Sequence, residues 1–198
     1  MKLRNYLHAI GLFPLLLIPA CAADTEDTKD EETESSADEL SAPSCTPSNA
    51  AGAVPKKHRA MLDTIAFTEG TAGSCGQDGY NTGFGFNCFR SCTSHPRTVW
   101  SGGGYRSSAA GRYQFLTATW AGLGRSSFSP KNQDLGAMTL VRRRGVSLPT
   151  DRALSATEFS NAMKKLSYEW ASLPFSPYGQ PRRSLSTTRS KYCSRAGC

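Results

Sequence analysis

MLDTIAFTEG, residues 61–70, places apolar side chains at helical spacing and ends on an acid followed by glycine. The spacing predicts a helix over residues 57–69, and Gly70 is typical of the residue that ends one. Glu69 then lies at a helix C-terminus, where the helix dipole disfavours an anion, and on the apolar side of the helix. Both effects raise the pKa of its carboxyl group, as a general acid requires. On position alone, a surface glutamate at a helix end is the more common case.

Further along the chain, irregular and helical patterns alternate. Residues 73–111 are rich in glycine, serine, asparagine and aromatic residues, which favours short hairpins joined by long loops. Capping residues and apolar spacing predict further helices over residues 113–123, 130–145 and 155–174. Together these patterns predict an α+β fold that is mostly helical with a small β-hairpin insertion.

The charge of the chain is divided unevenly. Its 198 residues carry 23 Lys+Arg and 16 Asp+Glu, a net charge of +7. Residues 21–40 hold nine acids and one lysine, whereas residues 41–198 hold 20 bases and seven acids. We predict an acidic disordered tether over residues 21–56, because it lacks the apolar side chains needed for a core. Residues 57–198 suffice for one domain, and the sequence shows neither a multi-pass membrane pattern nor a dinucleotide-binding motif.

Residues 1–20 have the features of an export signal. Two bases precede the apolar run Leu7–Ala20, which is too short to span a bilayer. Cys21 follows in a context that resembles a bacterial lipobox, so we expect a lipoprotein-type signal peptide and lipidation of Cys21. The alternative is an ordinary signal-peptidase cut and free secretion. We therefore expect a protein of the cell envelope, an outer-membrane lipoprotein or a secreted one, that meets a membrane through a lipid anchor only.

Cysteine usage agrees with export. Beyond Cys21, six cysteines remain: Cys45, Cys75, Cys88, Cys92, Cys193 and Cys198. An oxidising compartment would pair them in one of fifteen ways. Cys193–Cys198 would staple the tail, and Cys75–Cys88 or Cys88–Cys92 would staple a loop. The competing interpretation is a zinc site made by Cys75, Cys88, Cys92 and His95; in an exported chain we favour disulfides and expect no metal or cofactor.

Several short blocks in residues 59–185 carry a family resemblance. In order they are MLDTIAFTEGT (61–71), GYNT (79–82), SHPR (94–97), AGRYQFL (110–116), FSPKNQD (128–134), WASLP (170–174) and YGQ (178–180). They resemble the lysozyme family of bacteriophage lambda, lytic transglycosylases that cut peptidoglycan. The resemblance implies a lysozyme-like fold, stapled here by disulfides, for residues 57–198. Residues 75–92 and 191–198 depart from the family pattern.

The resemblance implies that Glu69 is the catalytic residue. It would protonate the oxygen of the β-1,4 bond between N-acetylmuramic acid and N-acetylglucosamine. It would then accept the proton of the muramic 6-hydroxyl as this oxygen closes onto C1, leaving a 1,6-anhydro end without consuming water. One alternative is a hydrolytic muramidase that uses Asp78 as a second carboxylate. Another is a cell-wall-binding lipoprotein without catalysis.

The same motifs suggest substrate-binding residues and partners. Four residues are candidates for sugar stacking or amide hydrogen bonding: Tyr113, Gln114, Tyr178 and Gln180. Their alternative roles are core packing and helix capping. We interpret Arg112 as a solvated surface charge and His95 as a residue that fixes a turn. The expected partner is the glycan strand of peptidoglycan, whose anionic wall attracts a basic domain; we expect a monomer and no nucleic acid.

Overall fold

The computed structural model describes residues 44–198 and shows a mostly helical α+β fold. The α-helices are α1 (Lys56–Thr68), α2 (Thr117–Ala121), α3 (Pro130–Arg143), α4 (Ala156–Leu166) and α5 (Leu185–Ala196). The antiparallel strand pairs are β1 (Thr82–Gly83) with β2 (Asn87–Cys88), and β3 (Trp100–Gly102) with β4 (Tyr105–Ser107). Three short 3₁₀ helices are η1 (Pro47–Ala50), η2 (Ser74–Gly76) and η3 (Phe84–Phe86). Among the described residues, no helix is both long and apolar enough to cross a membrane.

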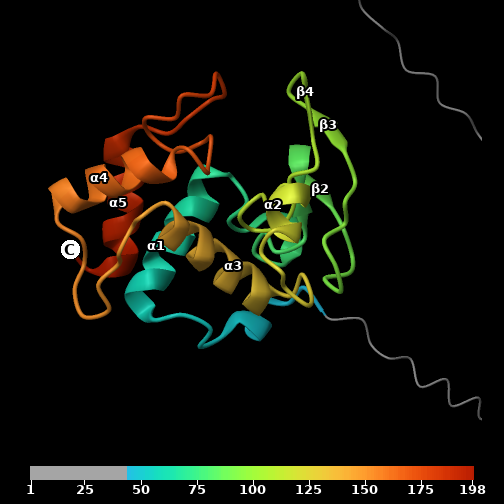
Figure 1. The fold of residues 1–198 in the computed structure, drawn as a ribbon, viewed down its shortest axis with the longest axis horizontal. Coiled ribbons are helices and arrows are strands. Elements are labelled where there is room, and N and C mark those ends of the chain that lie inside the picture. The colour runs from blue at the N-terminus through green and yellow to red at the C-terminus, as the bar shows by residue number, and fades with distance from the viewer. Residues whose placement is uncertain (1–43) are drawn as a thin grey trace, which may run out of the picture. The chain divides into compact units, whose positions relative to one another are not determined.

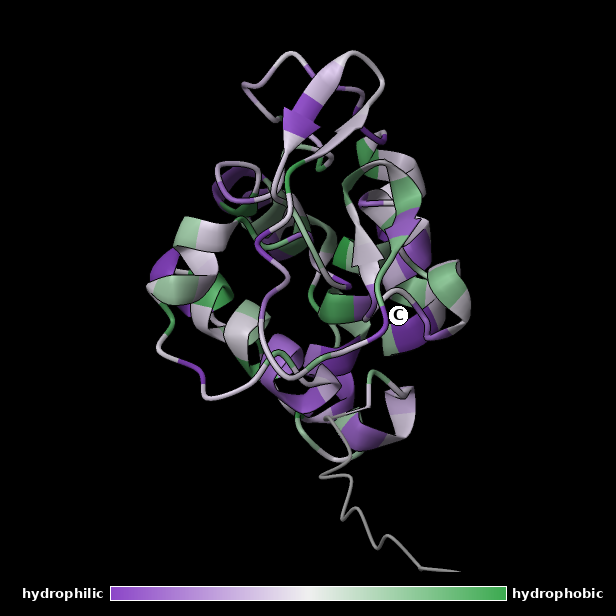
Figure 2. Ribbon diagram, turned by 90° about the vertical axis from the view of Figure 1, so that its right-hand side faces the viewer, coloured by the Kyte–Doolittle hydropathy of each residue, from purple (hydrophilic) through white to green (hydrophobic). Residues whose placement is uncertain are grey.

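Helix α1 lies in the middle of the helical part of the fold (Figure 1). It packs against α5 and α3, and α5 also contacts α4. The strands and α2 lie together on the other side of the view in Figure 1. Figure 2 shows that the helices carry both apolar and polar bands, as expected of helices that turn one face to a core and the other to water.

The helix predicted from MLDTIAFTEG is confirmed. Its side chains Met61, Leu62 and Ile65 are fully buried in the core. Glu69 is the residue that caps the C-terminus of α1, and Gly70 follows with a φ of 75°. This left-handed conformation favours glycine, so the chain leaves the helix directly after Glu69. The core beneath α1 therefore holds the backbone of Glu69 in place.

The capping signals of the two later helices are also confirmed. Ser129 accepts a hydrogen bond from the Asn132 N–H at the start of α3. Ser155 and Glu158 form a reciprocal capping box at the start of α4. Helix α4 nevertheless ends at Leu166, earlier than predicted, and the chain continues in a turn in which the Leu166 carbonyl accepts the Glu169 N–H at 2.8 Å and the Trp170 N–H at 3.0 Å.

The helix predicted over residues 113–123 is wrong in its first half. Ala110 and Phe115 exchange two backbone hydrogen bonds, of 3.0 and 2.8 Å, which close a tight turn in place of a helix. The turn requires Gly111, since a Cβ atom there would lie 2.2 Å from Oε1 of Gln133. Only α2, Thr117–Ala121, is helical in this segment.

Helix α5 is absent from the sequence prediction. Its sequence, LSTTRSKYCSRA, is mostly polar, and only Thr188, Tyr192 and Ala196 are buried. Ser184 caps its N-terminus by accepting the Thr187 N–H at 3.1 Å. The helix packs closely on α1. Residues 191–198, which depart from the family pattern, therefore contribute to the packing around the helix that ends at Glu69.

The six cysteines form three disulfides, Cys45–Cys92, Cys75–Cys88 and Cys193–Cys198. The tail staple and one of the two loop staples are thereby confirmed, whereas the Cys88–Cys92 alternative is wrong. The three thiols of the competing zinc site are all oxidised in these pairs.

The N-terminal boundary of the domain differs from the predicted one. Cys45 is buried and bonded to Cys92, and Ala50 is buried in the same core. Residues 44–55 therefore belong to the domain and not to the predicted tether of residues 21–56. The expected signal peptide of residues 1–20, Cys21 and the tether up to residue 43 lie outside the described residues.

Candidate active site

Glu69 is a half-buried carboxyl group at the end of α1. Burial raises its pKa to about 7, although hydrogen bonds from Ser172 act in the opposite direction. The hydroxyl of Ser172 donates to Oε1 of Glu69. A carboxyl group with this pKa holds its proton in part near neutral pH and gives it up readily, as both general acid and general base catalysis need.

Ser172 is a site residue that the sequence analysis did not identify. It lies 103 residues beyond Glu69, in the segment after α4. Trp170, two residues before Ser172, holds this segment on the core, because its indole N–H donates to the Tyr113 carbonyl at 3.0 Å. Ser172 lies inside the WASLP block, which carries part of the family resemblance. That position was the signal in the sequence that could have pointed to a functional role for this serine.

Two of the four predicted substrate-binding residues make hydrogen bonds within the protein. Tyr113 is fully buried, and its hydroxyl donates to Oδ1 of Asp134 at 2.5 Å. It is a core residue, and its predicted contact with substrate is wrong. Gln114 is half-buried, and its amide N–H groups donate to the carbonyls of Thr82 at 3.1 Å and Gly111 at 3.0 Å. It ties the turn before α2 to the β1–β2 hairpin.

The other two predicted binding residues are exposed. The Tyr178 side chain is 47% exposed, and its hydroxyl donates to the Tyr168 carbonyl at 3.2 Å. Gln180 lies two residues further on and is also exposed. Both side chains follow the segment that carries Ser172, and their contact with a glycan stays a prediction.

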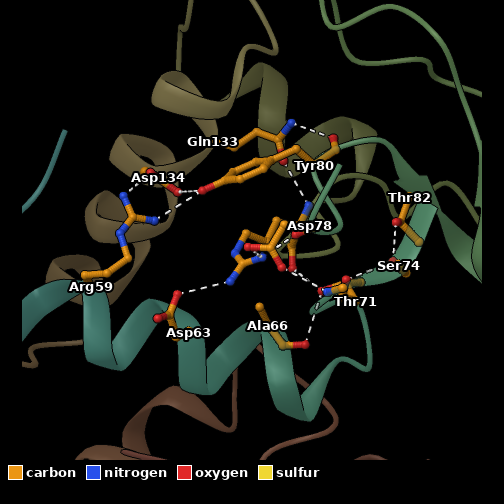
Figure 3. A network of polar contacts seen from close by, with 12 residues as sticks. Arg59, Asp63, Ala66, Thr71, Ser74, Asp78, Tyr80, Thr82, Gln133 and Asp134 are labelled. Carbon is orange, nitrogen blue, oxygen red and sulfur yellow. Dashed lines mark hydrogen bonds and ion pairs between the residues drawn. The ribbon is translucent and has the colours of Figure 1, made fainter. Parts of the chain in front are cut away.

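A largely buried polar network joins α1, α3 and the segment between α1 and β1 (Figure 3). Asp134 of α3 is fully buried and accepts hydrogen bonds from Tyr80 at 2.9 Å, from Tyr113 and from Arg59 of α1. Burial raises the pKa of both tyrosines, and the negative charge of Asp134 adds to the rise. Both phenols therefore stay protonated and act as donors to the carboxylate.

Arg112 forms the second part of the network. Its guanidinium group pairs with Asp63 of α1 at 3.0 Å and with Asp78 at 2.6 Å. Its side chain is only 4% exposed, so the interpretation as a solvated surface charge is wrong. The pairs connect α1 to the loop before β1 and thereby stiffen the surroundings of Glu69.

His95 fixes a turn, as predicted. It is buried, with Nε2 at 2.8 Å from the Phe115 carbonyl and Nδ1 accepting the Arg97 N–H at 3.1 Å. Burial lowers its pKa, and the nearby charge of Arg97 acts in the same direction, which favours the neutral ring.

The described residues contain seven carboxylate side chains, and most are already paired. Those in ion pairs are Asp63, Asp78, Asp134, Glu158 and Glu169. Asp151 is exposed and Glu69 is half-buried. In this part of the chain, Glu69 is therefore the carboxyl group that combines shielding from water with freedom from a cationic partner.

Comparison with known proteins identifies the family of the chain. The Endolysin family model matches residues 59–198. The chain belongs to the endolysin family. It is 34% identical to the endolysin of Escherichia phage lambda over 135 residues, which cover 64% of this chain and 83% of the lambda protein. It is also 34% identical to the endolysin of Escherichia phage P2 over 143 residues, covering 64% and 84% of the two chains.

Solved structures of a phage lysozyme have the same fold as this endolysin-family chain. Bacteriophage lambda lysozyme complexed with a chitohexasaccharide superposes with a TM-score of 0.64 at 31% identity, covering 73% of this chain and 96% of that one. A second structure of the lambda lysozyme gives a TM-score of 0.60 at 29% identity, covering 72% and 95%. The chain is accordingly a lysozyme-like glycosidase that degrades peptidoglycan.

Proposed function

We propose that this endolysin-family chain is a lytic transglycosylase with Glu69 as its single catalytic residue. Protonated Glu69 donates to the oxygen that joins N-acetylmuramic acid to N-acetylglucosamine, and the bond from this oxygen to C1 of the muramic ring breaks. The Glu69 carboxylate then accepts the proton of the muramic 6-hydroxyl while O6 bonds to C1. This step forms the 1,6-anhydro ring and restores protonated Glu69. The observation that carries the proposal is the position of Glu69, half-buried at the end of α1 and without an ion pair among the described residues. Burial there raises its pKa to about 7, which suits one group that must both give and take the proton.

The state of Asp78 supports this mechanism over hydrolysis. A retaining or inverting hydrolase uses two carboxyl groups, and Asp78 was the candidate for the second. Its carboxylate pairs with Arg112 at 2.6 Å and accepts the Gly73 N–H at 2.9 Å. Both carboxylate oxygens of Asp78 are therefore already engaged, and attack on C1 or activation of a water would require these contacts to be given up.

The ligand we propose is the glycan strand of peptidoglycan, with Tyr178 and Gln180 as exposed contacts. Support comes from the lambda lysozyme structure, which holds a chitohexasaccharide. Residues 41–198 carry 20 bases and seven acids, so a polyanionic wall attracts the domain, more strongly at low salt. We further propose that the chain acts as a monomer in the cell envelope, exported by residues 1–20 and anchored by a lipid on Cys21.

Mass analysis of the products from purified peptidoglycan tests the proposal. Wild type should release muropeptides one water lighter than hydrolysis products, and Glu69→Gln should lose about 10²–10⁴-fold in rate or more. Asp78→Asn, checked for folding by circular dichroism, should still produce anhydro ends.

Two results would contradict the mechanism. Reducing ends from the wild type, lost in Asp78→Asn, would make the chain a hydrolytic muramidase. Intact wall binding by a wild type that cleaves nothing would leave the third candidate, a binding lipoprotein without catalysis.

A further inference from the structure

An exposed phenylalanine lies beside Gly70, the residue that follows the candidate catalytic Glu69. Phe86 of η3 is 62% exposed, the highest value among the exposed large hydrophobic residues of the described chain. The edge of its ring faces the backbone that follows Glu69: a Cβ atom on Gly70 would lie 3.3 Å from Cζ of Phe86. Apart from Gly70 and its two neighbours in the sequence, Phe86 is the only described residue with an atom within 4 Å of that position. The ring therefore lies close to Gly70, the residue that follows Glu69, and leaves most of its surface to water.

The backbone of Phe86 is held in an uncommon conformation. Its φ is 62°, in the left-handed region, which is unfavourable for a bulky residue and is found mostly where other structure enforces it. Folding gains little from this arrangement, because the ring that it presents is exposed rather than packed in the core. Such residues gather at ligand-binding sites, where the unfavourable conformation serves recognition.

Three features enforce this conformation in the loop of residues 75–88, which we call the stapled loop. Its two ends are joined by the Cys75–Cys88 disulfide. Strands β1 and β2 pair across it, with Thr82 opposite Cys88. The loop also abuts β3, since a Cβ atom on Gly102 would lie 2.9 Å from Cα of Gly85. The stapled loop is thus a rigid support for one aromatic ring.

We propose that Phe86 is a substrate-positioning residue whose ring stacks on the apolar face of an N-acetylhexosamine next to the bond that Glu69 protonates. The inference rests on the proposed function and deepens it by naming a contact within the same site. A pyranose ring of this type presents axial C–H bonds on its faces, such as those of C1, C3 and C5 on one of them, and these fit an aromatic surface that is flat and held still. Gly70 has its own part in this arrangement, because a side chain there would push the ring of Phe86 away.

A series of variants at Phe86 tests the stacking. Phe86→Leu keeps an apolar side chain but removes the flat ring, and we expect apparent KM on peptidoglycan to rise about tenfold with kcat within about twofold. Phe86→Tyr keeps the ring and should retain the wild-type KM. Val99→Ala removes another exposed apolar side chain that does not reach Gly70, so it serves as the control and should leave both constants unchanged.

Binding without turnover separates this inference from the proposed function. In the Glu69→Gln background, calorimetry with chitohexaose should show a Kd about tenfold weaker when Phe86→Leu is added. Opening the staple with Cys75→Ser and Cys88→Ser should weaken binding in the same way, and Phe86→Leu should then add little, because both changes remove the same held ring.

The possible results separate the role of Phe86 from the proposed catalytic function. Unchanged KM and Kd in Phe86→Leu, with wild type still cleaving peptidoglycan, would overturn the role of Phe86 alone. A wild type that does not cleave would overturn the proposed function. A kcat that falls while KM and Kd stay constant would also count against stacking, since it would show a structural effect on Glu69 instead.

Discussion

At the scale of single residues, Glu69 shows how a sequence pattern and its surroundings combine. The helix end and the apolar neighbours were visible in the sequence, and burial is the larger cause of the raised pKa in the structure. The contact with Ser172 was not visible, because it joins residues 103 positions apart. That hydrogen bond favours the ionised form and so limits the rise in pKa.

This balance predicts the pH dependence of the activity. Protonated Glu69 is the active acid, so the rate should fall as pH rises through about 7, the raised pKa of the group. Ser172→Ala removes a donor that lowers this pKa, so the falling limb should move to higher pH by about 1 pH unit. The pH profile of kcat/KM on peptidoglycan measures both. A limb that moves to lower pH in Ser172→Ala, or stays in place, would show that the hydrogen bond does not control the acid.

At the scale of elements, buried charge joins helices that differ widely in sequence position. In the sequence, Asp134 lies near the start of the helix predicted over residues 130–145. The structure places it further into α3, fully buried, where it accepts hydrogen bonds from Arg59 of α1 and from Tyr80 and Tyr113. Its role is to hold α1 against α3, and so to support the helix that ends at Glu69.

Removing the charge of Asp134 should therefore be costly. Asp134→Asn keeps the size of the side chain but leaves Arg59 without its carboxylate, and we expect a loss of about 3–5 kcal/mol in the free energy of unfolding. Urea denaturation measures this loss. Asp151→Asn, which changes an exposed acid, is the matched control and should leave the midpoint unchanged. Equal midpoints for the two variants would show that the buried network contributes little to stability.

At the scale of the whole molecule, the disulfides differ in the length of chain that they close. Cys45–Cys92 joins residues 47 apart, whereas Cys193–Cys198 joins residues only five apart. Closing a longer loop removes more conformational entropy from the unfolded chain. The long bridge also holds the N-terminal segment, including η1, on the domain.

The loop lengths predict unequal effects on stability. Replacing Cys45 and Cys92 together by alanine should cost about 4 kcal/mol, against about 2 kcal/mol for Cys193 and Cys198. Unfolding in urea under oxidising conditions compares the two variants with wild type. A larger loss from opening the tail bridge would contradict the entropic account and would point to packing of α5 as the dominant contribution.

Local signals predicted much of the secondary structure and the central acid. Helix α1, the caps at Ser129 and Ser155, and the short hairpins follow from apolar spacing and turn residues, which act over a few positions. Helix α5 escaped prediction because its sequence is mostly polar and lacks a strong apolar stripe, although the folded helix packs closely on α1. Tyr113 was predicted to contact substrate and Arg112 to lie on the surface, whereas both are buried. A sequence does not show which polar side chains find buried partners.

Short blocks of neighbouring residues were enough to predict the fold class, the family and Glu69 as the candidate acid. Tertiary packing sets what surrounds the Glu69 carboxyl group. Ser172 and Phe86 reach Glu69 and Gly70 from distant segments, and Arg112 occupies Asp78, the other candidate carboxylate. The pKa of a group, the pairing of charges and the exposure of a ring all depend on distances between side chains that are far apart in the sequence. These distances are set only when the whole chain packs.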